Sequence, residues 1–294
     1  MRARLAIGAI LLLALIAPAH ADTDWSAVGK ALGRSGAQAA GGVYRVGLPR
    51  SDLKVTLDGV QLKPALALGS WLAFRPMGDR DAMVMGDLVL TQPEVNPVLT
   101  KLLDSGIEVT ALHNHLLRSE PATMYMHVLG HGDPVKLATA LHAALQESGT
   151  PLSDTPANAP SAAVDLDTAA IDRVLDHKGK VNGGVYQVSI PRAETIKDDG
   201  MDVPEAMGSA IAINFQPTGK GKAAITGDFV LIASEVNPVL RAMRAAGIEV
   251  TAVHNHMLDD EPRLFFMHFW ANDDVGKLAQ GLRSALDKVN LRHS

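Results

Sequence analysis

The chain of 294 residues contains one segment twice, and this repeat limits its architecture more than any other feature. Residues 106–115 read GIEVTALHNH, and residues 247–256, which lie 141 positions later, read GIEVTAVHNH. Across the longer segments 94–115 and 235–256, 15 of 22 positions are identical. Segments this similar within one chain predict two tandem units that share a fold.

Composition divides the chain into four stretches. Residues 1–21 begin with Arg2 and Arg4, continue with an apolar run at 5–16 and end in a small-residue cleavage pattern, so they predict a signal peptide. The run is shorter than a typical membrane span, and we expect the remaining chain to be periplasmic or secreted with no integral membrane segment. Two repeat units follow, joined by a linker rich in Pro, Ser and Ala; the units are 22–149 and 163–294, and the linker is 150–162.

Charge and cysteine content exclude several classes of protein. The formal net charge is −5, and loss of the two signal arginines makes it −7. The chain has no run of Lys and Arg, so nucleic acid and anionic membranes are not expected partners. It also has no cysteine, which excludes disulfides and thiolate metal sites. A bound metal must therefore be held by nitrogen and oxygen ligands.

Turn residues and hydrophobic periodicity predict the same order of elements in both units. In the first unit, an opening helix and four short strands are expected at 25–32, 43–48, 54–57, 70–74 and 82–90. Asn96 as N-cap with Pro97, and Gly106 at the other end, predict the next helix. Strands at 107–115 and 122–129 and a helix from 134 to 145 complete a β-α-β-β-α core.

This order of elements predicts an α+β protein made of two tandem homologous units. Each unit is expected to hold a mostly antiparallel sheet with its helices on one face. The β-α-β step requires its two strands to be parallel neighbours or to be separated by one strand. We expect the two units to pack on each other as an intramolecular pseudo-dimer.

Three histidines in each unit are among the repeated residues: His113, His115 and His127, and then His254, His256 and His268. Residues two apart in a strand share a face. The apolar face of strand 107–115, with Val109 and Ala111, is therefore expected to end in the imidazoles of His113 and His115. If the hairpin register places His127 opposite His113, three rings converge in each unit.

Three imidazoles with an open fourth position are typical of a catalytic-type zinc site, and copper, nickel or iron also suits such ligands. Glu120 and Glu261 lie in matched hairpin loops and are candidates to complete the coordination shell or to act as a general base. Asp87 and Asp228 also match, and we interpret them as turn or edge carboxylates rather than as groups that orient a ligand histidine. No phosphate-binding or dinucleotide-binding motif is present, so no organic cofactor is expected.

Three functions remain open. The first is an exported protein with a histidine-rich pocket in each unit, which binds a metal ion or small ligand and takes up two metal ions per chain. The second is a metal-dependent periplasmic enzyme, either a hydrolase or a cupin-like protein. The spacing of His113, His115 and Glu120 matches the first cupin motif, but the predicted helices fit a cupin barrel poorly. The third is a non-catalytic interaction module in which the histidines are structural.

The repeated motifs resemble those of the LppY/LpqO-type family of exported bacterial proteins. They are residues 94–99 (EVNPVL), residues 106–115, the Met126-His127 strand and their second copies. The resemblance covers nearly the whole chain after the signal segment. It implies export and a tandem architecture but no activity, because the function of that family is unknown. Lipoprotein members carry a cysteine that this chain lacks, so the resemblance implies a free periplasmic protein.

Overall fold

The computed structural model describes residues 23–78, 80–153 and 163–292. The predicted signal segment 1–21 and most of the predicted linker lie outside these residues. Within the described ranges, no helix combines the length and apolar character needed to cross a membrane.

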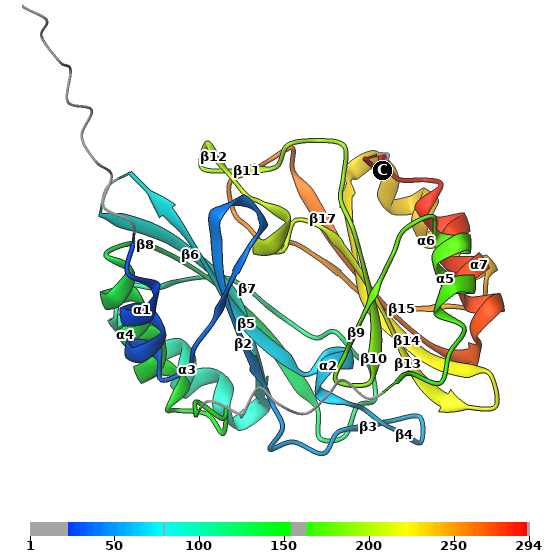
Figure 1. Ribbon diagram of the computed structural model, residues 1–294, viewed down its shortest axis with the longest axis horizontal. Helices are drawn as coiled ribbons and strands as arrows, with labels where there is room; N and C mark the ends of the chain where they lie inside the picture. Colours follow the sequence, from blue (N-terminus) through cyan, green and yellow to red (C-terminus); the bar gives the residue numbers. More distant parts are fainter. Residues whose placement is uncertain (1–22, 79, 154–162, 293–294) are drawn as a thin grey trace, which may run out of the picture.

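The chain forms four layers, with two sheets in the middle and helices on both outer sides (Figure 1). The helices over the first sheet are α1 (Trp25–Leu32), α3 (Gln92–Asp104) and α4 (Pro134–Leu145). Those over the second sheet are α5 (Thr168–Leu175), α6 (Ala233–Ala245) and α7 (Val275–Leu286). The predicted α+β class, with two similar units and helices on one face of each sheet, is confirmed.

The first sheet has six strands, and every neighbouring pair is antiparallel. Its spatial order is β1 (Ala37–Ala39), β2 (Val43–Pro49), β5 (Gly69–Met77), β6 (Asp81–Thr91), β8 (Thr123–Gly132) and β7 (Glu108–His113). Strand β8 lies between β6 and β7, so the β-α-β step joins two strands that are separated by one. Strand β7 lies at the edge of the sheet.

The second sheet repeats this order. It runs β9 (Lys180–Asn182), β10 (Val185–Ile190), β13 (Ile211–Gly219), β14 (Lys222–Ile232), β17 (Leu264–Asp274) and β15 (Glu249–His254), with β15 at the edge. Of the remaining short elements, η1 (Ala40–Gly42) is the turn that joins β1 to β2. The others lie in arms between the units; they are β3 (Thr56–Leu57), β4 (Val60–Gln61), α2 (Pro64–Ala67), β11 (Lys197–Asp198), β12 (Met201–Asp202), η2 (Glu205–Met207) and β16 (Asp260–Glu261).

Each unit extends one arm over the inner face of the other. The arm that carries β3, β4 and α2 reaches the second sheet, where the Lys63 N–H donates to Gln216 Oε1 at 2.8 Å. The arm that carries β11, β12 and η2 reaches the first sheet, where Arg45 donates to the carbonyl of Ala206. In Figure 1 the two arms lie at opposite ends of the space between the sheets.

Alternate residues of the central strands pack in two different layers. Val84 and Leu88 of β6 are buried against the helices of the first unit, whereas Met83 and Met85 pack among residues of the second unit. This follows from the period of two in a strand. The inner faces of the two sheets therefore form a second packed layer, and this layer holds the histidines.

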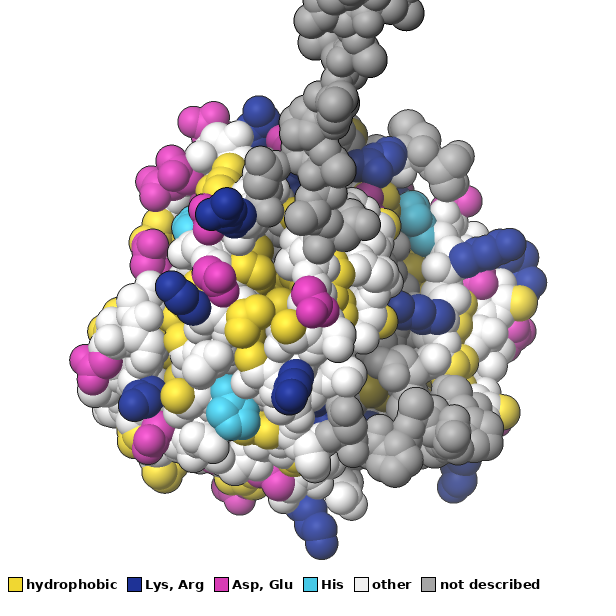
Figure 2. Space-filling model, turned by 60° about the vertical axis from the view of Figure 1, so that its left-hand side comes forward, with side chains coloured by type: hydrophobic (Ala, Val, Ile, Leu, Met, Phe, Trp, Pro, Cys, Tyr) yellow, Lys and Arg dark blue, Asp and Glu magenta, His cyan; other side chains and the backbone are white. Residues whose placement is uncertain are grey.

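On the outer face formed by the helices of the first unit, Lys and Arg side chains are interspersed with Asp and Glu (Figure 2). Leu103 in α3 and Val135 in α4 are among its exposed hydrophobic side chains, with 55% and 37% of their surface accessible. Apolar side chains scattered singly in this way are normal on a protein surface.

The central helix of each unit begins earlier than the sequence suggested. Helix α3 begins at Gln92 rather than at Pro97, and α6 begins at Ala233 rather than at Pro238. The predicted N-cap at Asn96 is therefore wrong. Thr91 is the N-cap instead, and its N–H donates to the Glu94 carboxylate at 2.7 Å. This carboxylate bond closes the first turn, and Pro97 lies inside the helix.

Glu94 also forms a buried ion pair that joins four segments of the first unit. The Arg50 side chain is 1% exposed and donates to both carboxylate oxygens of Glu94, at 2.8 and 3.0 Å, and to the Val89 carbonyl at 2.7 Å. The Gly149 N–H donates to the same carboxylate at 2.7 Å. The pair thus links the ends of β2 and β6 to α3 and to the segment after α4.

The second unit repeats this ion pair. Arg192 is 2% exposed and donates to Glu235 at 2.7 and 3.2 Å and to the Val230 carbonyl at 2.7 Å. Glu235 accepts in turn from the N–H groups of Ile232 and Asn290, both at 2.9 Å. Repetition of the whole network in both units indicates that it belongs to the fold rather than to one site.

We predict that Glu94→Ala lowers the free energy of unfolding by about 3 kcal/mol, because it leaves the buried Arg50 guanidinium with a single, partly exposed carboxylate partner. Urea unfolding followed by circular dichroism measures this change. The exposed Glu147→Ala, at the end of α4, serves as the matched control and should change the free energy by less than about 0.5 kcal/mol. A loss below about 1 kcal/mol for Glu94→Ala would contradict the assigned role.

Candidate metal centre

One extra residue in each edge strand decides which way the histidines point. In the first unit, Val109 pairs with Val128 and Ala111 pairs with His127, so Thr110 is a β-bulge without a partner of its own on β8. Two residues of one strand then oppose one residue of the next, and the alternation of faces shifts by one. Val109 consequently packs with the helix-side core, whereas Ala111 shares the inner face with His127.

The expected single face from Val109 to His115 is therefore wrong. After the bulge, His113 follows Ala111 on the inner face of the sheet, toward the other unit and away from the helices. The second unit has the same shift at Thr251, between the pairs of Val250 with Phe269 and Ala252 with His268. A bulge leaves no mark in hydrophobic periodicity, which is why the sequence placed these imidazoles on the helix-side core face.

The two bulge threonines also fasten the HNH segments to each other. The Thr110 hydroxyl donates to the His256 carbonyl at 2.6 Å, and the Thr251 hydroxyl donates to the His115 carbonyl. The amide of Asn114 donates to the Thr251 carbonyl at 3.3 Å, and that of Asn255 to the Thr110 carbonyl at 3.4 Å. These reciprocal bonds fix the two segments in one relative position.

All six histidine rings meet in one cluster between the sheets. They stack in three pairs, each with one ring from either unit, at centroid distances of 3.5, 3.6 and 3.7 Å; the pairs are His113 with His254, His115 with His268, and His127 with His256. The expectation of a separate pocket in each unit is therefore wrong. The reason is the bulge, because it turns both sets of rings toward the shared interface.

Aromatic rings close the two ends of the stack. Tyr125 lies 3.4 Å from the His115 ring, and Phe266 lies 3.5 Å from the His256 ring, measured between centroids. Tyr125 and Phe266 occupy matching positions in the two repeats, and each contacts an outer ring of the cluster. Their contacts limit movement of His115 and His256 along the stack.

The ring nitrogens divide into a bonded set and a free set. The Nδ1 atoms of His113, His254 and His268 lie 3.2, 3.1 and 2.8 Å from backbone carbonyl oxygens, so each carries the proton and donates it there. This leaves Nε2 as the atom with the lone pair, the usual arrangement of a metal-ligating histidine. All six Nε2 atoms are buried without a hydrogen-bond partner among the described residues.

The imidazoles are neutral near pH 7. Burial lowers the pKa of His113 to about 3, helped by the neighbouring His254, and lowers that of His254 to about 4. Burial and the adjacent imidazoles lower the pKa of the other four well below its usual value; these are His115, His127, His256 and His268. A neutral imidazole is the form that binds metal.

Two repeated carboxyl groups face the rings. Asp87 Oδ2 lies 3.7 Å from His115 Nε2, and Asp87 Oδ1 lies 3.8 Å from His127 Nε2. Asp228 lies 3.8 Å from nitrogens of both His256 and His268. The interpretation of these residues as turn or edge carboxylates is wrong, because both lie in central strands. Their identity in the two repeats was the signal that pointed to the site.

Burial makes both carboxyl groups hold their protons. It raises the pKa of Asp87 to about 8, against the opposing charge of Arg45. Burial raises the pKa of Asp228 well above its usual value, and the neighbouring Asp87 acts in the same direction. Arg45, which stacks 4.1 Å above the centre of the Trp71 ring, was not predicted as part of the site because the repeat does not preserve it.

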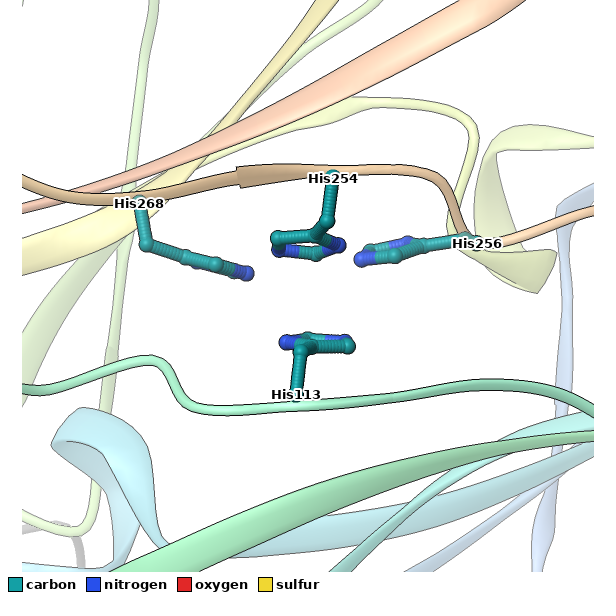
Figure 3. Close-up of side chains that lie close together, drawn as sticks. All are labelled: His113, His254, His256 and His268. Carbon is teal, nitrogen blue, oxygen red and sulfur yellow. The ribbon is translucent and has the colours of Figure 1, made fainter.

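The potential ligand atoms form two overlapping groups. Nitrogens of His113, His254, His256 and His268 all lie within 4.8 Å of one another, and so do those of His113, His115 and His127. Figure 3 shows the larger group, with His113 reaching from the first unit toward the three rings of the second. Because His113 Nδ1 is bonded to a carbonyl, His113 offers one free nitrogen to both groups.

The two candidate glutamates lie outside these groups. Glu120 is exposed, and its backbone pairs with Thr56 through two hydrogen bonds of 2.9 Å. Glu261 is also exposed and pairs through β16 with Lys197 of β11. The structure therefore brings together the six predicted histidines but keeps both predicted carboxylates in the surface arms.

A small cavity adjoins the histidines. Its volume is about 10 Å³, and its lining includes His127 and His256. A space of this size holds about one water molecule. His113, His115 and His254 keep part of their surface accessible, whereas His127, His256 and His268 are at most 8% exposed.

Fold and site together define a tandem α+β protein with a buried polyhistidine cluster between its halves. The chain belongs to the family described as Domain of Unknown Function (DUF1259), whose sequence model matches residues 26–147 and 169–288. No curated protein matches the chain. The crystal structure of the trimeric bacterial microcompartment shell protein PduB matches over 86% of this chain and 89% of its own, at 12% identity and a TM-score of 0.22. A score this low carries no structural conclusion.

We predict that the metal-free protein loses stability as the pH falls below 6.5. The unfolded chain then takes up protons on six imidazoles that stay neutral in the fold. Asp87 and Asp228 have the opposite effect on stability. In the unfolded chain these carboxyl groups lose their protons near pH 4, whereas the folded chain still holds the protons at pH 5 to 6. The net difference of about four protons gives a slope of up to about 5 kcal/mol per pH unit between pH 6 and 5.

Urea unfolding of chelator-treated protein from pH 5 to 8 measures this dependence. Above pH 7 the carboxyl contribution dominates, so stability should decline as the pH rises toward 8, with a slope of at most about 2.7 kcal/mol per pH unit for two protons. His131→Ala, which removes an exposed histidine of the same strand as His127, should leave the profile unchanged. Equal stability at pH 5 and 7 would show that the six rings are not buried as neutral groups.

Proposed function

We propose that this protein binds one transition-metal ion in a centre shared by its two units, and that it does so outside the cytoplasm as an LppY/LpqO-type protein. One observation carries the proposal. Six neutral imidazoles and two carboxyl groups converge on one buried place, where every Nε2 atom and one oxygen of each carboxyl group lack a partner among the described residues. Buried polar atoms are nearly always satisfied, and a metal ion would satisfy these together.

The donor set suits a metal of borderline or soft character. Imidazole binds zinc, copper, nickel and iron, and the absence of cysteine leaves nitrogen and oxygen donors at this site. Zinc–nitrogen bonds of 2.0–2.1 Å place opposite donors about 4 Å apart. The nitrogens of the four-histidine group, within 4.8 Å of one another, would need to shift by less than about 1 Å to close on one ion.

The shared ligand supports one ion per chain rather than two. His113 belongs to both groups and has one free nitrogen, so only one group can be complete at a time. The four-histidine group offers the larger donor set. Asp87 and Asp228 lie within 4 Å of rings in the cluster and would lose their protons next to a cation, which adds electrostatic stabilisation.

The surroundings favour binding over turnover. The adjoining cavity has room for about one water molecule, which is too little for an organic substrate. The glutamates considered as general bases lie in exposed arms. Storage, delivery or sensing of a metal ion fits a centre that is enclosed on both sides by sheets. Export rests on the signal segment and on the family resemblance, and appearance of the mature chain in a periplasmic extract would test it.

We predict that the full-length mature protein binds one ion tightly, measured by elemental analysis after gel filtration and by competition with a chelator. His113→Ala should weaken binding by at least about tenfold, because removing a ligand costs no less than removing a residue that orients one. His127→Ala leaves the four-histidine group complete and should weaken binding less than His113→Ala.

His131→Ala serves as the surface-histidine control and should bind as the unaltered protein does. Two ions per chain would contradict the shared centre. A larger effect of His127→Ala than of His254→Ala would place the ion in the three-histidine group instead. Absence of binding after incubation with zinc, copper, nickel and iron would overturn the proposed function.

A further inference from the structure

Six methionines gather on one side of the space between the sheets, and we call this the methionine side; they are Met77, Met83, Met85, Met201, Met207 and Met257. The first three belong to the first unit and the others to the second. They pack in, or against, a single hydrophobic cluster that joins the two units. Three of these thioethers line an open pocket at the surface and the other three line the small cavity beside the histidines, so they are candidate residues of a route between the two.

The route begins in an open pocket of about 580 Å³ between the β5–β6 hairpin and the β11–β12 arm. Met77, Met83 and Met201 line it, and the carboxylates of Asp81 and Asp202 offset the charges of its two basic residues. The basic residues are Arg75, which donates to the Asp202 carbonyl, and Lys197, whose Nζ lies 3.9 Å from Asp202 Oδ1. The pocket thus carries no net positive charge against an entering cation.

The route continues along the inner face of β6 to the histidines. Met83, Met85 and Asp87 are alternate residues on that face, so about 13 Å of strand separates the open pocket from the carboxyl group beside His115 and His127. Met85 also lines the small cavity at the centre, together with Met207 and Met257. That cavity touches His127 and His256, so thioethers extend from the surface to the cluster.

The pseudo-symmetric side of the molecule has no sulfur at the matching positions. The residues 141 positions away are Thr218, Ala224, Thr226, Val60, Leu66 and Leu116. Packing alone does not require methionine here, because the same fold fills the equivalent places with Ala, Thr, Val and Leu. The two units otherwise share one fold. The six methionines that the other side lacks all lie on the side with the open pocket.

From this asymmetry we propose that the methionine side admits monovalent copper to the histidine centre. The inference rests on the proposed function and specifies the metal and its route. Thioether sulfur is a soft ligand that suits Cu(I). It is not among the usual protein ligands of zinc, which are thiolate, imidazole and carboxylate. Cu(I) would pass from sulfur to imidazole by ligand exchange, in which one Cu–S bond breaks and one Cu–N bond forms without a change of oxidation state.

Loading of the metal-free full chain with Cu(I), supplied as its acetonitrile complex under anaerobic conditions, tests this route. The variant M77L/M83L/M201L keeps the side-chain volume and removes three thioethers from the pocket. We expect its Cu(I) loading rate to fall at least tenfold, while the final stoichiometry and the Zn(II) loading rate stay within about twofold. The matched control M124L/M126L/M243L changes three methionines of the helix-side cores and should load as the unaltered chain does.

Methionine methyl NMR of the unaltered chain gives a second readout that no variant can confound. Substoichiometric Ag(I), a redox-inert substitute for Cu(I), should shift the Met77, Met83 or Met201 signals before the ring signals of His113 and His254. Equal Cu(I) loading rates for both triple variants, or no methionine shift with Ag(I), would overturn the route. Failure of the unaltered chain to bind Cu(I) or Zn(II) at all would instead overturn the proposed function, and this inference with it.

Discussion

The β-bulges at Thr110 and Thr251 are the constraint on which the rest of the structure depends. Each inserts one residue into an edge strand and so transfers the following histidines from the helix-side core to the inner face of the sheet. Each threonine hydroxyl then donates to the backbone carbonyl of a histidine in the other unit. The bulge occurs once in each unit. It places the imidazoles on the inner face of the sheet, and its threonine forms a hydrogen bond between the two units.

The sequence predicted the features that depend on local pattern. The repeat predicted two units, the helix predicted at 134–145 matches α4, and the six matched histidines are the members of the cluster. Features set by long-range packing were missed. The bulge reverses the faces without changing the composition of the strand, and no pattern within one unit shows that its rings complete a site in the other. Asn96 failed as an N-cap because Glu94 closes the helix a turn earlier.

Because the unit is duplicated, the centre contains six histidines. The residues that differ between the two copies account for the metal specificity that we propose. Two copies of one HNH strand across a pseudo-two-fold axis bring six rings into contact, yet the ring of His113 serves two ligand groups and only one of them can be complete. Tyr125 faces the rings where the second copy has Phe266. The methionines break the symmetry further, so the two sides of one centre differ in the ligand atoms that they offer.

The central claim is that both units build one metal centre. Anomalous diffraction from crystals of the metal-loaded full chain, recorded at the absorption edge of the bound element, tests it most directly. The account predicts one peak per chain between the sheets, at about 2.0–2.1 Å from Nε2 of His113 and from imidazoles of the second unit. Two separate peaks, each enclosed by the three histidines of a single unit, or a peak confined to the protein surface, would contradict it.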